Sequence, residues 1–323
     1  MNMKAVGALA GFFALTLATS SKAQNLYSED FDTDHTANWT VNSGPGNNAA
    51  DFFFDYSTVG IPSAPNSSGG TTIGLKLEAN YSGSTFGGIS VSPMGQSFSG
   101  DYRVTFDLWE NFVGPAPGGG SGSTQITGGG MGTAGTTPQW SGGTIESIFF
   151  GSTGDGGSSI DYRAYSSVGN AGASGAYPSG SSVYAAPAGA VNNSDAYYAA
   201  LGGNTPPAAQ TTLYSQQTGT TAGGAPAFAW HAAVVEKIGN NVSYSLDGLL
   251  IATVDASTVT LGGGNILFNQ YDINASSSTD PNVRNLEFGL VDNVLVAQIP
   301  EPGTCAVAAL GVIGLLLARR RKI

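Results

Sequence analysis

Apolar and polar side chains alternate with a period of two in several segments of this 323-residue chain. In residues 101–111, Tyr102, Val104, Phe106 and Leu108 fall on one face, while mostly polar residues occupy the other. This alternation predicts a half-buried β-strand. Similar patterns predict further strands at 47–56, 72–78, 145–150, 160–165, 265–273 and 286–296.

The clearest unit lies between Phe228 and Asp255. Two period-two runs are separated by Gly239-Asn240-Asn241, and the second run is followed by Asp247-Gly248. Glycine and asparagine tolerate positive φ, and Asp-Gly is a preferred hairpin dipeptide. The pattern therefore predicts a three-stranded antiparallel meander.

Outside the strands, the sequence predicts one short helix and two long loops. Thr205 can cap a helix that has Pro206 in its first turn and continues over 208–217. The stretches 114–143 and 169–203 are rich in Gly, Ser, Thr and Ala, and both are interpreted as long loops on a β scaffold. The expected fold is all-β.

Both ends of the chain differ from this pattern. Residues 1–23 combine Lys4, an apolar stretch and a small-x-small ending at Ala23, which predicts a secretory signal peptide. Residues 300–323 begin with Pro300-Glu301-Pro302-Gly303 and continue with a 15-residue apolar run, 304–318. Arg319, Arg320, Arg321 and Lys322 follow as a stop-transfer cluster, so 304–318 is predicted to be a short transmembrane helix. The domain between the two ends is 24–299.

The order of Pro-Glu-Pro motif, short apolar helix and basic end resembles the PEP-CTERM tail of bacterial exosortase substrates. The resemblance implies that a membrane protease cuts near Pro300–Pro302 and passes the upstream domain to the surface or matrix. The chain is expected to cross the inner membrane and to be anchored by its C-terminus, transiently or permanently. A plain C-terminal anchor remains the alternative.

A second resemblance covers most of 24–297. The opening Tyr27-Ser28-Glu29-Asp30-Phe31-Asp32, the meander, and the closing segment 288–296 resemble strands of concanavalin A-like or LamG-like jelly rolls. The resemblance implies two stacked antiparallel sheets, with the closing strand beside the first. Ligands would bind on the concave face or at the loop rim.

Charge narrows the range of partners. Residues 24–299 contain 21 acidic and five basic side chains, a net charge of about −16 with neutral histidine. Such a domain repels phosphate backbones, which excludes nucleic acid as an expected partner. It is compatible with neutral polysaccharide and with divalent cations.

Catalysis is not expected. Laminarinase-like enzymes with this fold carry two carboxylates on one strand as Glu-x-Asp-x-x-Glu, and this string is absent from the chain. Asp107 and Glu110 come nearest, but their odd spacing points them to opposite faces of a regular strand. Only two histidines, His35 and His231, could serve a triad or a zinc site, and no Gly-x-Ser-x-Gly elbow is present.

Two kinds of binding site remain as hypotheses. The jelly-roll resemblance implies a structural calcium ion held by Glu29, Asp30 and Asp292, and the alternative is a solvated acidic edge. Trp109 and Trp140 are the candidate platforms for sugar rings, because Trp109 lies on the polar face of its strand and Trp140 in a long loop. Core packing is the alternative for both.

The sequence therefore predicts an exported, non-catalytic surface or matrix protein that associates with extracellular polysaccharide. A structural coat or adhesion protein without a glycan site is the first alternative. A glycoside hydrolase is the second.

Overall fold

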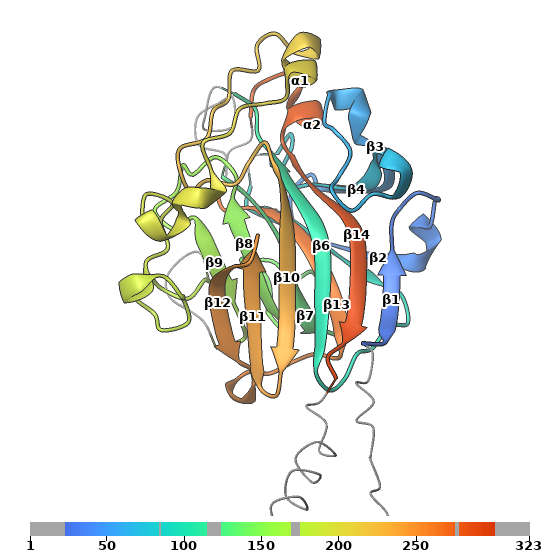
Figure 1. The fold of residues 1–323 in the computed structure, drawn as a ribbon, viewed down its shortest axis with the longest axis vertical. Helices are drawn as coiled ribbons and strands as arrows, with labels where there is room; N and C mark the ends of the chain where they lie inside the picture. Colours follow the sequence, from blue (N-terminus) through green and yellow to red (C-terminus); the bar gives the residue numbers. More distant parts are fainter. Residues whose placement is uncertain (1–22, 84, 115–123, 169–174, 275–277, 301–323) are drawn as a thin grey trace, which may run out of the picture. The chain divides into compact units, whose positions relative to one another are not determined.

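The computed structural model describes residues 23–83, 85–114, 124–168, 175–274 and 278–300. Gln24–Gln298 forms one compact unit, and two antiparallel β-sheets form its scaffold (Figure 1). This arrangement confirms the predicted all-β jelly-roll sandwich. Nearly all of the predicted signal peptide and the whole predicted membrane helix lie outside the described residues. Within the described residues, no helix has the length and hydropathy of a membrane span.

Sheet A has the strand order β12-β11-β10-β6-β14-β4-β3, and β1 also pairs with β14. Its strands are β1 (Asn25–Glu29), β3 (Ala49–Asp55), β4 (Ile73–Glu78), β6 (Tyr102–Asn111), β10 (Trp230–Ile238), β11 (Asn241–Leu246), β12 (Leu249–Asp255) and β14 (Phe288–Gln298). The predicted meander is β10-β11-β12. The predicted closing strand, β14, lies beside β1 as expected.

Sheet B has the order β2-β5-β13-β7-β8-β9. Its strands are β2 (Trp39–Ser43), β5 (Gly87–Pro93), β7 (Gln125–Thr133), β8 (Ile148–Thr153), β9 (Tyr162–Tyr165) and β13 (Asn265–Asp272). In Figure 1, sheet A faces the viewer and sheet B lies behind it.

Short helices connect the strands. The α-helices are α1 (Ala208–Leu213) and α2 (Val283–Leu286). The 3-10 helices are η1 (Thr36–Asn38), η2 (Tyr56–Val59), η3 (Ser68–Gly70), η4 (Pro187–Gly189), η5 (Ala196–Leu201) and η6 (Ala256–Thr258). The predicted helix exists as α1, but it ends four residues earlier than predicted. Pro207 occupies its N-cap, and no side chain caps it.

The core fills the space between the sheets. Phe106 of β6 meets Phe268 of β13 edge to face, with ring centroids 5.0 Å apart. Alternate residues of β6 therefore point inward, as the sequence pattern predicts. The same alternation sends Asp107 outward and Glu110 inward, so their predicted separation onto opposite faces is confirmed: Glu110 accepts a hydrogen bond from Ser152 of sheet B.

One prediction about the loops is wrong. The stretch 114–143 was expected to be a loop, but it contains β7, which is hydrogen-bonded to β13 and β8 in the middle of sheet B. Three consecutive glycines, Gly128, Gly129 and Gly130, lie in this strand. A Cβ on Gly130 would lie 2.2 Å from the carbonyl oxygen of Ile148, so the close approach of β8 requires glycine there.

Candidate functional site

Two adjoining hollows lie beside β1, with volumes of about 340 and 400 Å³. Both are lined by Ser28, Glu29 and His35. Asp30, Asn293 and Val294 complete the first, and Tyr27, Ala37, Asn38, Pro93, Met94 and Gln96 complete the second. We call the two hollows together the β1 groove. Its wall combines apolar surface with carboxylates, amides and a histidine.

The sequence after β1 fixes the polar centre of the groove. Phe31 adopts a left-handed conformation with φ of 58°, so the chain turns directly after Glu29. The Phe31 backbone N–H then donates to Glu29 Oε1 at 3.0 Å, and His35 Nδ1 lies 3.0 Å from Glu29 Oε2. The carboxylate of Glu29 is thereby held in one orientation. It can accept a hydrogen bond from a ligand hydroxyl.

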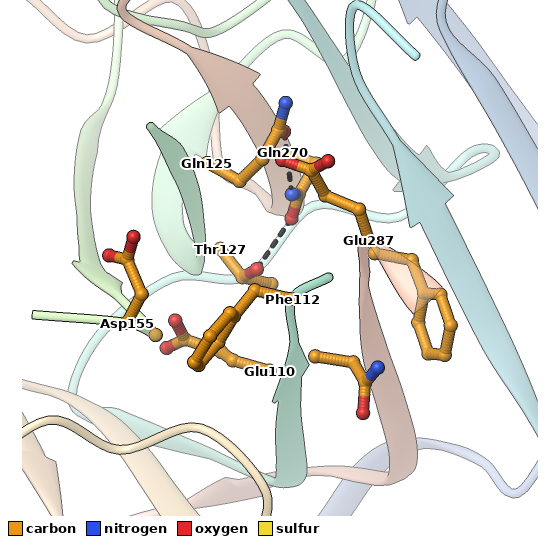
Figure 2. A pocket seen from close by; sticks show the side chains of 10 residues that line it. Glu110, Phe112, Gln125, Thr127, Asp155, Gln270 and Glu287 are labelled. Atoms are coloured by element: carbon orange, nitrogen blue, oxygen red, sulfur yellow. Dashed lines mark hydrogen bonds between the residues drawn. The ribbon is translucent and has the colours of Figure 1, made fainter. Parts of the chain in front are cut away.

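A second cavity lies between the sheets at the end of the sandwich where β6 finishes. Figure 2 shows Glu110, Asp155 and Glu287 around it, together with Gln125, Thr127 and Gln270. The amide Nε2 of Gln270 donates to Gln125 Oε1 at 2.9 Å, and Thr127 Oγ1 donates to Gln270 Oε1 at 2.5 Å. Three acidic residues thus line one small space, and no basic side chain is in its lining.

Burial dominates the electrostatics of this cavity. It raises the pKa of Glu110 well above the usual range, the Ser152 hydroxyl opposes the shift, and the charge of Asp155 adds to it. Burial likewise raises the pKa of Asp155, against a hydrogen bond from the Gly157 backbone. The neutral form of Glu110 is therefore favoured relative to that of an exposed glutamate. A neutral acid beside a second carboxyl is a pairing that acid–base catalysis could use.

The size of the cavity limits its chemistry. Its volume is about 10 Å³, which is roughly the space that one water molecule requires. A sugar ring does not fit into this space. The cavity can hold a water among the carboxyl and amide groups, and the two sheets would have to separate to admit a substrate.

The structure does not bring the predicted calcium ligands together. Among the described residues, no group of three or more His, Cys, Asp or Glu side chains could hold a metal ion. Glu29 and Asp30 line the β1 groove, whereas the Asp292 carboxylate accepts hydrogen bonds from Tyr56, Ser67 and the Asn293 backbone. The three predicted ligands therefore do not form one site among the described residues.

Both predicted tryptophan platforms are buried. Trp109 is 2% exposed; it packs against Trp230 with ring centroids 5.6 Å apart, and its Nε1 donates to Asn111. Trp140 is 5% exposed and lies on the outer face of sheet B, where Gly88 leaves room for its ring. These predictions are wrong because segments distant in sequence cover the outer face of each sheet.

Of the predicted sorting motif, only Pro300 is among the described residues, and it is exposed. Glu301, Pro302, Gly303 and the basic cluster lie outside them. The residues of the β1 groove other than Glu29 and Asp30, and the partners of Glu110 across the cavity, were not predicted. They come from separate segments, and no local pattern links them.

The chain was compared with known families and structures. Residues 298–322 match the PEP-CTERM protein-sorting motif, as the resemblance predicted. This motif implies an exported protein that an exosortase sorts to the cell surface or the extracellular space. No curated protein matches the chain.

Several solved structures are similar in fold. The endo-1,3-beta-glucanase from Streptomyces sioyaensis is 15% identical over 88% of this chain and 99% of its own, with a TM-score of 0.44. A Bacillus subtilis protein of unknown function with a galectin-like fold is 12% identical, covering 86% and 100%, with a TM-score of 0.43. The Ca²⁺-bound VIP36 exoplasmic/lumenal domain is 9% identical, covering 83% and 86%, with a TM-score of 0.40.

Proposed function

We propose that this chain is a non-catalytic surface or matrix protein that associates with extracellular polysaccharide after export and exosortase processing. The PEP-CTERM match at residues 298–322 is the observation that supports sorting by an exosortase. A secretory signal peptide at 1–23 directs the chain into the export route. The apolar segment 304–318 anchors the chain in the membrane, either until processing or permanently.

The β1 groove is the site we assign to the polysaccharide. Its volume suits one or two sugar rings, and its wall mixes apolar surface with a few oriented polar groups, as ligand sites do. Asn38 and Met94 are exposed at its rim, and Glu29 and Gln96 offer hydrogen-bonding groups to sugar hydroxyls. The negative groove favours a neutral glycan over an acidic one.

A glycoside hydrolase is the second candidate, because Glu110 and Asp155 both line one cavity. The closed geometry of this cavity argues against a hydrolase. The cavity has room for a water but not for a glycosidic linkage, and its carboxyls lie between the sheets rather than along the open groove.

Intact mass tests the sorting proposal. Protein from cells and medium is compared between wild type and the triple variant Pro300→Ala/Glu301→Ala/Pro302→Ala. We expect wild type to lose both residues 1–23 and the tail, and the variant to keep the tail. A full-length tail in wild type would leave a plain anchored protein and remove exosortase from the account.

Binding to insoluble neutral polysaccharides tests the groove. The double variant Asn38→Ala/Gln96→Ala removes two amides from its wall and should weaken binding about tenfold, at about 0.5–1.5 kcal/mol per lost hydrogen bond. The matched control Asn240→Ala/Gln216→Ala removes two amides from exposed positions elsewhere and should bind like wild type. Equal binding by both variants would refute the groove assignment, and release of reducing sugar by wild type would favour the hydrolase.

A further inference from the structure

Residues 62–70, which we call the strap, lie over the outer face of sheet A and are tied to it by two carboxylates. Asn66 donates to Asp107 through its backbone N–H, at 3.1 Å, and through its side-chain Nδ2, at 2.8 Å. Ser67 Oγ donates to Asp292 at 3.1 Å. Trp230 Nε1 also donates to the carbonyl of Pro62 at 2.8 Å.

The two carboxylates are neighbours across the β6–β14 ladder. Asp107 and Asp292 are register partners, and they are 1% and 0% exposed. The β-bulge that follows places Asn293 in a left-handed conformation with φ of 53°. Its side-chain Nδ2 then reaches Asp107 Oδ2 at 2.9 Å. Two acidic groups are thus buried side by side.

No cation faces this pair among the described residues. The strap places Asn66 and Ser67 against the pair, and η2 places the titratable Tyr56 there. Asp55, the neighbour of Tyr56, accepts hydrogen bonds from Ser57 and Thr72 instead. Strand β10 places Ala232 opposite Asp107, and the Asp247–His231 pair lies beyond it. Strand β4 packs against Tyr56 with Gly74, and its charged Lys76 is paired with Glu78. Two full negative charges buried side by side would repel each other strongly.

The hydrogen-bond partners decide which carboxyl can hold a proton. All three donors to Asp107 are N–H groups, which cannot accept a hydrogen bond in return. Asp292 instead faces two hydroxyls, those of Tyr56 and Ser67, and a hydroxyl both donates and accepts. The Tyr56 hydroxyl also has the carbonyl of Thr71 at 3.3 Å as an alternative acceptor. Asp292 can therefore donate a proton to a hydroxyl, whereas Asp107 cannot donate to any of its three partners.

We propose that Asp292 holds a proton in the closed structure, and that loss of this proton releases the strap from sheet A. The strap then covers the buried carboxyl pair and the edge of Trp230 in acid, and it opens as the pH rises. Burial raises the pKa of Asp292 to about 7, and the charge of Asp107 adds to this shift against the Tyr56 and Ser67 hydrogen bonds.

The direction of the pH effect follows from linkage. With the strap open, Asp292 is hydrated and its pKa is close to the ordinary value of about 4. The closed form holds its proton more tightly, so closure is favoured in acid. The open fraction should rise about tenfold per pH unit between about pH 5 and 7, and should level off above the closed-state pKa.

Hydrogen exchange on the full chain in detergent tests this proposal. We expect the protection of residues 62–70, corrected for intrinsic exchange, to fall about 100-fold between pH 5 and pH 7.5. Peptides from β13 report global opening and should stay more protected than the strap at both pH values, because the strap opens without the rest of the domain. Asp292→Asn keeps an acceptor and adds donors without a titrating proton, so its strap should stay equally protected at both pH values.

The exposed cap Asp255, which accepts from Ser257, provides the matched control. Asp255→Asn should retain the wild-type pH response. Equal strap protection at pH 5 and pH 7.5 in wild type would overturn the proposal, as would an unchanged pH response in Asp292→Asn. Restoration of protection at pH 7.5 by millimolar Ca²⁺ alone would also overturn it, because a cation rather than a proton would then balance the pair.

Discussion

At the residue scale, buried carboxyl groups influence how the stability of this protein depends on pH. Asp272 shows the principle: it is fully buried, and it accepts from Asn80, Thr124 and Asn274. Burial raises the pKa of its carboxyl to about 7, against these hydrogen bonds. Groups of this kind bind protons more tightly in the folded chain than in the unfolded one. They therefore make folding stability fall as pH rises from about 4.

Glu110 provides a test at this scale. Glu110→Gln keeps an acceptor for Ser152 and removes the charge that burial disfavours. Because the folded protein prefers the neutral acid, the substitution should stabilise the protein by at least about 1 kcal/mol more at pH 8 than at pH 5. Urea unfolding at the two pH values measures the difference. Glu146→Gln makes the same exchange of a carboxyl for an amide at a glutamate that accepts from the hydroxyl of Thr137, and it is the control for the exchange itself.

The strands of this fold differ in how clearly the sequence predicts them. Strands β6, β10, β11 and β12 follow a period-two pattern because one of their faces is covered and the other is partly open. Strand β7 has almost every residue buried, so its two faces do not differ in polarity. The glycines that suggested a loop are needed there for close packing. Strands β2 and β5 were missed as well: β5 is buried throughout, and β2 is a short strand of five residues.

A glycine-to-alanine substitution, which adds one methyl group, tests the packing of β7. Gly130→Ala places a Cβ against the backbone oxygen of Ile148, which cannot move without breaking the β7–β8 ladder. We expect a loss of about 2 kcal/mol or more in the free energy of unfolding. Gly223→Ala is the matched control, because a Cβ at Gly223 meets nothing within 4 Å. It should change stability by less than about 0.5 kcal/mol. Equal midpoints in urea for the two variants would contradict this account of β7.

The sequence predicted sites less well than elements, and burial explains the difference. The face of β6 that carries Trp109 looks polar in sequence, but the strap and Trp230 cover it in space. The cavity around Glu110 joins β6, β7, β13 and the start of β14, which are far apart in the chain. Local periodicity contains no information about which distant segments meet. The spacing of Asp107 and Glu110 was interpretable because both lie on one strand.

At the scale of the whole molecule, both ends of the compact unit leave from one place. The Gln298 backbone N–H donates to the carbonyl of Gln24 at 2.8 Å, so the first and last strands run side by side to the same edge. Strand β6 begins opposite Gln298 and ends at Asn111, whose Nδ2 lies 3.3 Å from Gln210 Oε1 of α1. At about 3.3 Å per residue, α1 lies some 30 Å from the two ends (Figure 1).

The described domain therefore has two distinct ends: Gln24 and Gln298 mark one, and α1 marks the other. Because the first and last residues lie side by side, a segment attached to either of them joins the domain at the same place. Copies of the domain carry the same negative charge and repel one another wherever they are brought close together.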